Sequence, residues 1–481
     1  MNDTGERVLF RWEEAARVLG CGLFMPETGN RTAGFCAVSV DSRQVERGGL
    51  FVALPGENTD GHGFVDEAFK AGAAGALVRK DHGEKYALIK AAEGDGNNNG
   101  GVLLIVDNTL RALQLLAKAY LDKFPGLLRI GITGSSGKTT TKEIAAAIIG
   151  RERRVVYNRA NLNSDMGLPL SVFQVRAEHE AGIFELGMNR RGEIAESAGV
   201  LRPHLALVTN VGSAHIGNIG TEEGIAQEKK AIFSFFTGAE TAFVPAGSAF
   251  AAYLCEGVNG NVCLYPYAAA IADTIVGGVF AGVKDCGIFG WEWMFEGETA
   301  HFSLPGRYNL ENAAAAVTIA RALGIGREAI VRGLSSVKPL PGRGEVVETE
   351  MNGHRVTVVN DGYNANPDSM EKALLFFDGT AWNGRKIVVA GEMFELGERS
   401  AEEHEKLFLR LNAVNADKKY FFHVSNTAFQ GGNIAVFDDR DRLKAALHSD
   451  ARENDLVLLK GSRLCALERL LAPQGLPLGT A

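Results

Sequence analysis

Residues 131–141 read GITGSSGKTTT, and this stretch decides the fold of the chain around it. It begins inside an apolar run, 127–133, and leads into a helical pattern, KEIAAAII. Glycines allow backbone N–H groups to curl around phosphate oxygens, and the N-terminus of the following helix adds positive potential. A strand, a glycine-rich loop and a helix in this order predict a nucleotide-binding α/β domain.

The loop also carries the side chains that a nucleotide phosphate needs. Lys138 can reach the β- and γ-phosphates, and the Thr139 hydroxyl can ligate Mg²⁺. The strict GxxxxGK[ST] spacing is not met, because its first position falls on Ile132. A chance glycine-rich turn is the alternative, and the flanking strand and helix argue against it. The other loop residues that we expect to bind ATP are Gly134, Ser135, Ser136, Gly137 and Thr140.

The composition of the 481 residues is that of a soluble protein with full cores, at 46% hydrophobic and 22% charged. This length predicts two to four domains, with three as the first expectation. A net charge of −8 without a basic stripe argues against a nucleic-acid partner. We also expect no stable membrane insertion and a cytoplasmic location, since apolar runs of spanning length and a signal peptide are lacking. A monomer is expected as well. Six scattered cysteines read as reduced thiols.

Short apolar runs alternate with helical patterns along most of the chain, which predicts α/β units. The chain divides into three blocks, 1–108, 109–337 and 338–481, with borders after the strand-like run 102–106 and at the proline-bearing segment 338–342. A polar, glycine-rich stretch at 93–101 is expected to be a surface loop. Helical patterns are seen at 109–123 and 309–323. The strand-like runs are 102–106, 127–133, 183–186, 205–209, 356–359, 386–390, 420–424, 434–437 and 456–459.

Polar and glycine residues gather directly after these strands, in GMNRRGE, NVGSAHIG, NDGYNANPD, GEMFELGE and KGSR. Because open parallel sheets bind ligands beyond the carboxyl ends of their strands, we expect two α/β domains with sites facing each other across a cleft. Glu185 ends one strand and is the expected acidic partner of Mg²⁺; a salt-bridged turn glutamate is the alternative. His215 follows another strand, where a hydrogen-bonded structural histidine is the alternative.

Together these motifs resemble the Mur ligase family of ATP-dependent amide ligases. Residues 133–140 satisfy that family's TGxxGK[ST][ST] loop, and further matches follow in the family's order over nearly the whole chain, among them QEKKAIF, GRYNLENAAAAV and NANPDSM. The resemblance implies three domains: an N-terminal α/β domain that binds a nucleotide sugar, a central P-loop domain with a parallel sheet, and a C-terminal Rossmann-like α/β domain.

The resemblance also implies roles for individual residues. Lys138 and Thr139 match the catalytic lysine and the magnesium-binding hydroxyl of the loop, and Glu185 and His215 match magnesium-associated positions. Lys229 matches the lysine that is carbamylated in this family, a change that turns a repelled ammonium into an anionic oxygen ligand. Without the resemblance, Lys229 would be interpreted as a helix-surface lysine, and its neighbour Lys230 is the alternative assignment.

The remaining matches concern nucleotide and peptide contacts. The ATP-contacting positions are Asn309, Asn312, Arg343 and Asp361; the substrate positions are Ser42, Arg43, Asp60 and His62 for the uridine nucleotide, Asn161 and Asn163 for the muramoyl peptide, and Tyr363, Asn364 and Asn366 for the dipeptide end of the cleft. Each also has a plain structural interpretation. Asn favours helix N-caps, an arginine near a proline-bearing linker can be solvated, and Asp-Ser and Asp-Gly pairs are ordinary turn chemistry.

The NANPDSM and GEMFELGERS segments resemble the family members that add D-alanyl-D-alanine to UDP-N-acetylmuramoyl-tripeptide. The implied reaction phosphorylates the peptide carboxylate with ATP, and the dipeptide amine then attacks the acyl phosphate. Another ligase of this architecture is the first alternative, either the tripeptide-forming muramoyl ligase or folylpolyglutamate synthase. A non-catalytic nucleotide-binding regulatory protein is the alternative from another class, and a phosphate-loop kinase is the last.

Overall fold

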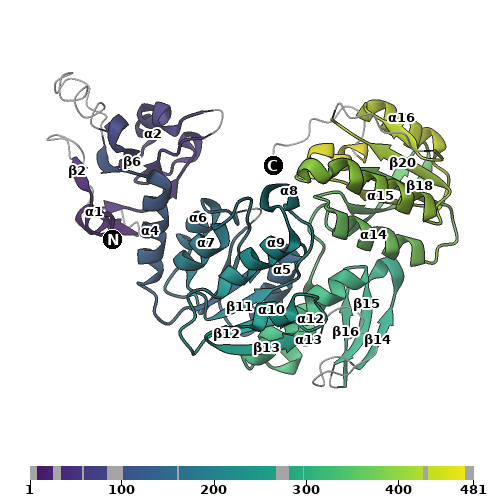
Figure 1. Ribbon diagram of the computed structural model, residues 1–481, viewed down its shortest axis with the longest axis horizontal. Helices are drawn as coiled ribbons and strands as arrows, with labels where there is room; N and C mark the ends of the chain where they lie inside the picture. Colours follow the sequence, from purple (N-terminus) through teal and green to yellow (C-terminus); the bar gives the residue numbers. More distant parts are fainter. Residues whose placement is uncertain are drawn as a thin grey trace.

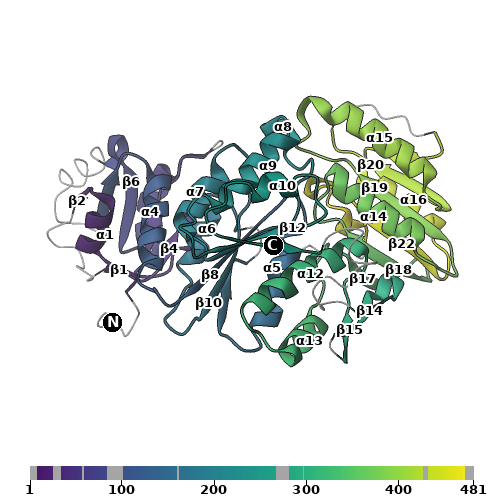
Figure 2. The same cartoon turned by 60° about the horizontal axis from the view of Figure 1, so that its bottom comes forward.

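The computed structural model forms three lobes that follow one another along the chain (Figures 1 and 2). It describes residues 8–24, 34–56, 59–83, 101–159, 162–266, 281–295, 297–425 and 432–471. Each lobe contains its own β-sheet, and the first and third lobes lie at opposite ends of the molecule with the central one between them. The predicted three-part α/β architecture is confirmed, whereas the residue boundaries of the three domains stay predictions.

The N-terminal lobe is built on a five-stranded sheet of order β2-β7-β6-β5-β4, parallel except for β2. Its elements are β1 Phe10–Arg11, α1 Trp12–Leu19, β2 Gly22–Phe24, β3 Gly34–Phe35, β4 Val38–Ser39, β5 Leu50–Val52, α2 Val65–Ala71, β6 Gly75–Arg79, β7 Val102–Val106 and α4 Thr109–Leu121. Residues of β5 alternate between two cores, with Leu50 and Val52 packed toward α1 and α4 and Phe51 toward α2. The sheet is therefore covered on both faces.

The central lobe is a six-stranded parallel sheet of order β13-β12-β11-β8-β10-β9. Its elements are β8 Leu128–Thr133, α5 Lys138–Ile149, β9 Val155–Tyr157, α6 Gly167–Val172, β10 Ala181–Glu185, α7 Glu193–Leu201, β11 Leu205–Val208, α8 Ile216–Ile219, α9 Glu222–Lys230, β12 Thr241–Pro245, α10 Ala251–Cys255, β13 Asn261–Tyr265, α12 Arg307–Ala322 and α13 Arg327–Ser336. Strand β8 lies inside the sheet between β10 and β11, so the loop after it opens at the middle of the carboxyl edge.

A three-stranded antiparallel sheet precedes α12, and the sequence did not predict it. Its strands are β14 Ala281–Asp285, β15 Trp291–Phe295 and β16 Glu298–Phe302. Each strand has only five residues, and buried Trp293 and Phe302 follow the polar residues Glu292 and His301, so none forms a long apolar run. The sheet packs against α13 and extends the core on that face of the central lobe.

The C-terminal lobe is a six-stranded sheet of order β17-β18-β22-β19-β20-β21, parallel except for the edge strand β17. Its elements are β17 Glu345–Met351, β18 His354–Asp361, α14 Pro367–Gly379, β19 Lys386–Gly391, α15 Ser400–Ala413, β20 Lys418–Phe422, β21 Ala435–Phe437, α16 Arg440–Asp450 and β22 Asp455–Lys460. All four strands predicted with continuous apolar runs after residue 380 are present. Strand β17 was missed because EVVETEM mixes acidic and apolar residues, as an edge strand can.

Helix α4 contacts α1 and β6 of the first lobe and also α6 and α7 of the central lobe, so it bridges the two. Of the predicted helices, 109–123 corresponds to α4 and 309–323 to α12, each shifted by two residues or fewer at either end. The expected surface loop at 93–101 lies outside the described residues except for Gly101. Within the described ranges, no helix has the length and apolar composition needed to cross a bilayer.

Candidate active site

The phosphate loop connects β8 to α5, and two of its glycines adopt backbone conformations that other residues avoid. Gly134 and Gly137 have φ values of 151° and 76°. A Cβ on Gly134 would lie 1.8 Å from Thr209 Oγ1, and one on Gly137 would lie 2.2 Å from Asn312 Oδ1. Both positions therefore require glycine on conformational and steric grounds. Gly137 is also the N-cap of α5, so the helix N-terminus points at the loop.

The segment after β11 holds this loop in place. Asn210 Oδ1 accepts a hydrogen bond from Ser136 N at 3.0 Å, and Thr209 Oγ1 donates to Ser136 O at 2.6 Å. Ser135 Oγ exchanges hydrogen bonds with the backbone of Gly212, donating to its oxygen at 3.1 Å and accepting from its nitrogen at 2.9 Å. Residues 209–212, which include the start of the NVGSAHIG motif, thus hold the phosphate loop in position by hydrogen bonds.

Glu185, at the end of β10, lies directly beside the loop. Its carboxylate accepts a hydrogen bond from Thr139 Oγ1 at 2.7 Å and one from Asn163 Nδ2 at 2.6 Å. Lys138 donates to Gly134 O at 2.8 Å, and burial lowers the pKa of its ammonium. Glu185, Thr139, Asn163 and Lys138, all predicted from the sequence, are therefore brought together at the carboxyl edge of the sheet.

Two further residues position Glu185, and neither was predicted from the sequence. Asn158 is buried, accepts a hydrogen bond from Glu185 N at 2.9 Å and donates to Glu185 O at 3.0 Å. The fully buried Lys142 in turn donates to the Asn158 carbonyl oxygen and pairs with Glu143 at 3.1 Å. A lysine on the apolar face of α5 was the available signal, because such a side chain needs buried partners.

Lys229 is fully buried in the last turn of α9, so its interpretation as a helix-surface lysine is wrong. Its Nζ has no hydrogen-bond partner among the described residues. Burial and the nearby Lys138 ammonium hold the pKa of Lys229 well below its ordinary value. Lys230, the alternative assignment, instead donates to Tyr253 O at 2.7 Å. The buried amine without a hydrogen-bond partner is therefore Lys229 and not Lys230.

His215 caps α8 with a left-handed backbone, at φ 62°. Its Nδ1 lies 2.7 Å from Glu395 Oε2, which belongs to the loop after β19 in the C-terminal lobe. This contact and the proximity of Lys138 lower the pKa of Glu395. His215 thus joins the central lobe to the C-terminal lobe at the edge of the phosphate loop.

Asn309 and Asn312 lie in the first two turns of α12 and are buried. The N-cap of this helix is Gly306, so the interpretation of Asn309 as an N-cap is wrong. Asn309 Nδ2 instead donates to Pro305 O at 2.8 Å, and Asn312 Oδ1 accepts from Thr141 Oγ1 at 3.3 Å. Helix α12 therefore presents both amides beside the phosphate loop.

The C-terminal lobe contributes the other wall of the site. The Arg343 guanidinium lies 4.0 Å from the centroid of the Tyr363 ring, and Asp361 pairs with Lys460 at 2.9 Å. Lys460 also donates to Asn364 O at 2.8 Å, which fixes the NDGYNANPD loop against KGSR. Lys460 is a residue of a quoted motif to which the sequence analysis gave no role.

A cavity of about 350 Å³ lies between the central and C-terminal lobes. It is lined by Ser135, Ser136, Gly137, Lys138, Thr139, Thr140, Asn163, Glu185, His215, Asn309, Asn312, Arg343, Asp361, Tyr363, Asn364 and Asn366, with Tyr308, Glu311 and Lys372 among the others. Lys229 is not part of this lining but interacts electrostatically with Lys138 and Glu185, which are. Loop amides, three lysines and carboxylates converge here, so the cavity suits a polyphosphate and a divalent cation.

Four predicted residues lie elsewhere, in the N-terminal lobe. Asp41 and Asp60 each cap a short 3₁₀ turn, as ordinary turn chemistry expects. Arg43 is exposed and pairs with Asp41 at 2.8 Å, and Ser42 is buried with its hydroxyl 3.4 Å from Glu67. Asn161 lies outside the described residues.

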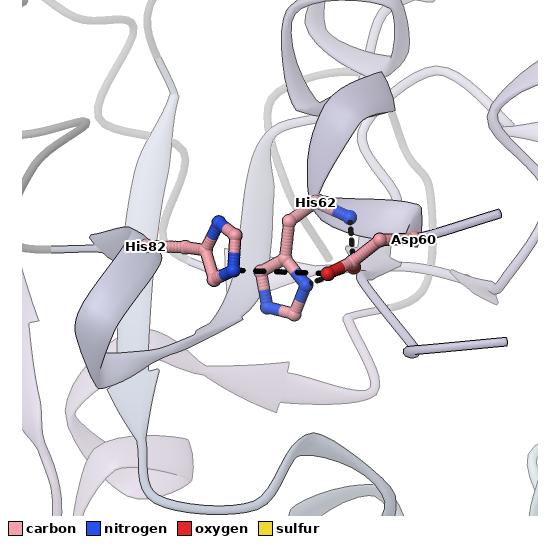
Figure 3. A group of neighbouring side chains, drawn as sticks. All are labelled: Asp60, His62 and His82. Carbon is pink, nitrogen blue, oxygen red and sulfur yellow. Dashed lines mark hydrogen bonds and ion pairs between the residues drawn. The ribbon is translucent and has the colours of Figure 1, made fainter.

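Asp60, His62 and His82 form a cluster of metal-ligating types in that lobe (Figure 3). The His62 ring stacks on His82 at 4.3 Å, and its Nδ1 lies 2.5 Å from Asp60 Oδ1. His62 Nε2 accepts the Arg79 N–H at 2.9 Å, which places the ring proton on Nδ1, where it is donated to Asp60. Because both nitrogens are engaged, His62 does not fit a metal and anchors the turn instead.

Comparisons with known proteins agree with this geometry. Family models match residues 35–121 (Mur ligase family, catalytic domain), 132–320 (Mur ligase middle domain) and 342–463 (Mur ligase, glutamate ligase domain). A relative from Treponema pallidum, UDP-N-acetylmuramoyl-tripeptide–D-alanyl-D-alanine ligase, is 42% identical over 91% of this chain and 93% of its own length. The Bacillus subtilis protein of the same name is 30% identical, over 90% and 92%.

Solved structures give the same result at the level of the fold. The MurF ligase from Thermotoga maritima, in complex with ADP, has a TM-score of 0.73 and 30% identity, and the match covers 90% of this chain and 96% of that one. MurF from Acinetobacter baumannii has a TM-score of 0.81 and 27% identity, covering 96% and 97%. With all three family models matched in order, this chain belongs to the Mur ligase family of ATP-dependent, amide-bond-forming enzymes.

Proposed function

We propose that this enzyme joins D-alanyl-D-alanine to the terminal carboxylate of UDP-N-acetylmuramoyl-tripeptide, a step of peptidoglycan precursor synthesis. The observation that carries the proposal is the cavity between the lobes, where the phosphate loop faces Tyr363 and, from the discriminating NANPDSM segment, Asn364 and Asn366. Relatives that match nine-tenths of the chain carry the name of this activity. The enzyme is proposed to act as a monomer in the cytoplasm.

The chemistry explains why a phosphate loop and a peptide site share one cavity. A carboxylate and an ammonium do not condense in water, because both are ionised. Attack of the tripeptide carboxylate on the γ-phosphate forms an acyl phosphate and releases ADP; the dipeptide amine then attacks the acyl carbon and expels phosphate. Lys138 offsets negative charge on the transferring phosphoryl group, and the loop amides orient it.

The residues around Glu185 fit a magnesium ion. Hard cations of this kind prefer oxygen ligands, and the Thr139 hydroxyl and Glu185 carboxylate are already held against one another at 2.7 Å. We propose that these two residues, with His215, hold Mg²⁺, which would supply charge neutralisation to the phosphates. ATP itself is proposed to contact Asn309, Asn312, Arg343 and Asp361, and Asn163 the muramoyl peptide.

The Lys229 amine has no hydrogen-bond partner among the described residues, and this supports its carbamylation. Addition of a lysine amine to the carbon of CO₂ forms an N–C bond and releases one proton, and it requires the neutral amine. Burial and the Lys138 charge favour that neutral form. A carbamate would give the buried nitrogen a polar extension toward Glu185 and Lys138, which are its electrostatic neighbours. We propose that the extended side chain completes the ion site.

The N-terminal lobe is proposed to bind the uridine nucleotide, within a domain that spans residues 1–108. Ser42, Arg43, Asp60 and His62 lie on this lobe, at or beside turns after its strands. Asp60 and His62 would act there by fixing the turn, because their side chains are already paired with each other. The central domain, 109–337, and the C-terminal domain, 338–481, would then hold ATP and the dipeptide between them.

Phosphate release tests this proposal directly. The full enzyme with ATP, Mg²⁺, UDP-N-acetylmuramoyl-tripeptide and D-alanyl-D-alanine should release phosphate, and omission of either peptide substrate should reduce release to background. Glutamate or diaminopimelate acting in place of the dipeptide would contradict the assignment and favour another ligase. Slow turnover that ignores both peptides would instead favour a regulatory protein. Transfer of ¹⁸O from the labelled carboxylate to phosphate is expected from the acyl phosphate.

A further inference from the structure

We propose that a side chamber of the active site binds the incoming zwitterionic dipeptide by both of its charged ends, with Glu395 contacting the ammonium and Arg463 contacting the carboxylate. This inference rests on the proposed function and deepens it. Neither residue was among those predicted from the sequence, although both belong to strand-end motifs, GEMFELGE and KGSR.

The chamber has a volume of about 210 Å³ and opens beside the phosphate loop. It shares Ser135, Lys138, His215, Asn364, Ala365 and Asn366 with the larger cavity. Its own lining comes from two loops of the C-terminal lobe, Phe394, Glu395 and Leu396 after β19, and Ser462, Arg463 and Leu464 after β22. A small polar ligand in this chamber would therefore lie next to the reacting phosphoryl group, while ATP occupies the larger cavity.

Glu395 is held in a defined position at one side of the chamber. Its backbone has a left-handed φ of 65°, which non-glycine residues rarely adopt and which indicates that the surroundings impose it. The preceding Phe394 N–H donates to Ser462 Oγ at 3.1 Å, and Met393 N–H donates to His404 Nε2 at 3.0 Å. Its carboxylate lies 2.7 Å from His215 Nδ1, and Glu395 lines the chamber. The carboxylate is thus held at a defined place on the chamber wall.

Arg463 provides the opposite charge on the same lining. Its guanidinium lies 4.9 Å from the centroid of the Tyr363 ring, which also carries Arg343 at 4.0 Å. No carboxylate forms an ion pair with Arg463 in the part of the chain that the structure describes. A stacked guanidinium keeps its planar donor edge available and binds carboxylates bidentately. It is therefore suited to recognise the C-terminal carboxylate of a short peptide.

The polarity of binding follows from the reaction. The dipeptide amine must approach the acyl phosphate, which forms where Lys138 meets the γ-phosphate. Glu395 interacts electrostatically with Lys138 and contacts His215, so the ammonium end belongs at Glu395. Arg463, from the other loop, then defines how far the second residue extends.

The carboxylate contact is tested with Arg463→Gln and two nucleophiles, D-alanyl-D-alanine and D-alanyl-D-alaninamide, which lacks the carboxylate. The wild-type enzyme should show a KM about tenfold higher for the amide, corresponding to one charge-assisted contact. Arg463→Gln should raise the KM for D-alanyl-D-alanine about tenfold and leave that for the amide unchanged. Arg469→Gln, at an exposed arginine that lines neither cavity, serves as the control and should change neither KM.

The ammonium contact is tested with Glu395→Gln and D-lactoyl-D-alanine, an inhibitor in which a hydroxyl replaces the ammonium. The variant should raise the KM for D-alanyl-D-alanine about tenfold without weakening the inhibitor. A merely structural role, through the His215 contact, would weaken both equally and would overturn the assignment. Glu398→Gln, exposed in the same loop, is the matched control.

The outcomes separate this inference from the proposed function. Absence of dipeptide-dependent phosphate release in the wild-type enzyme would overturn both. Normal wild-type activity, together with an Arg463→Gln variant whose KM is unchanged or rises equally for both nucleophiles, would overturn the subsite alone.

Discussion

At the scale of one residue, the buried amine of Lys229 lowers the free energy of unfolding of the protein. A buried amine without a hydrogen-bond partner costs roughly 1–3 kcal/mol. Lys229→Met, prepared in buffer free of CO₂, should therefore unfold at higher denaturant concentration, with the free energy of unfolding raised by about 1–3 kcal/mol. Ligase turnover should fall by roughly 100-fold or more, since the proposed carbamate is lost.

Lys230→Met is the matched control for this substitution, because Lys230 is adjacent on α9 and already has a partner in Tyr253 O. Its turnover should stay close to wild type. A Lys229→Met enzyme that is less stable than wild type would contradict the assignment of a buried amine without a partner. Density or mass beyond the Lys229 nitrogen in protein equilibrated with bicarbonate would support the carbamate independently.

The sequence predicted the residues of this site where their role depends on local spacing. Lys138 and Thr139 follow a strand and open a helix, and Glu185 ends a strand, so the shared sheet edge already implied their meeting. Asn158 could not be found in this way, and Lys142 is signalled only as a lysine on the apolar face of a helix. Their contacts join the segment after β9 to α5 and β10, and local spacing does not encode which residues pair over such distances in the chain.

At the scale of elements, the phosphate loop can pack against α12 only because residue 137 is a glycine and has no side chain. Gly137→Ala would place a Cβ 2.2 Å from Asn312 Oδ1 and force alanine into a φ of 76°. We expect a loss of about 1–3 kcal/mol in the free energy of unfolding and at least a tenfold weaker affinity for ATP. Equilibrium denaturation and titration with a fluorescent ATP analogue measure the two effects.

Gly126→Ala is the control for Gly137→Ala. Gly126 lies in an exposed turn, and a Cβ there would meet no atom within 4 Å. Its stability should be unchanged or slightly higher, because alanine reduces the entropy of the unfolded chain. Wild-type ATP affinity in Gly137→Ala would show that α12 can move away from the loop, contrary to the tight packing of buried Asn312.

The loop after β19 depends on a buried, neutral histidine of α15. His404 Nε2 accepts the Met393 N–H, and burial lowers the pKa of His404 below its ordinary 6.5. Below pH 6.5, His404 is protonated in the unfolded chain but not in the folded protein. This difference persists until the pH also falls below the lowered pKa of His404 in the folded protein. Stability should therefore decrease as pH falls through this window, by at most about 1.4 kcal/mol per pH unit from this residue.

Denaturation between pH 7 and pH 5 tests this expectation. His404→Gln, which keeps a donor and an acceptor but does not titrate, should show a shallower loss of stability than wild type. His301→Gln, at a largely exposed position, should follow the wild-type curve. An identical slope in His404→Gln and wild type would mean that His404 is not the group that titrates.

Element types were predictable where apolar runs are continuous and were missed where burial is one-sided. The runs of β19 and β22 are buried on both faces, and each is fully buried along its length. Strand β15 instead alternates buried Trp291 and Trp293 with polar or exposed neighbours. Such short alternating strands depend on their antiparallel partners, which a single segment of sequence does not reveal.

At the scale of the whole molecule, the central and C-terminal lobes touch at several points around the cavity. Asp368 Oδ2 accepts hydrogen bonds from Ser213 N at 2.6 Å and Ser213 Oγ at 2.9 Å, and Lys372 pairs with Glu311 at 2.9 Å. These contacts join α14 to the segment after β11 and to α12. The arrangement encloses the site from both lobes, as exclusion of water from an acyl phosphate requires.

The contact of Gly217 with the loop after β19 allows this arrangement to be tested at a residue that lines neither cavity. Gly217, in α8, lies so close to the loop after β19 that an added Cβ would be 2.5 Å from Gly397 N and 2.8 Å from Glu395 O. Its backbone φ lies outside the range that favours glycine, and alanine is the better helix former. Gly217→Ala should therefore be tolerated within the central lobe and resisted only where the two lobes meet.

We expect Gly217→Ala to keep or raise the stability of the central lobe while it weakens the approach of the C-terminal lobe. Small-angle X-ray scattering should give a larger radius of gyration than wild type, and kcat should fall about tenfold or more, because the cavity is assembled from both lobes. Asn218→Ala, exposed on the same helix, should change neither quantity. An unchanged radius together with a wild-type kcat would mean that turnover does not require this contact, and the enclosed arrangement would then not be the reactive one.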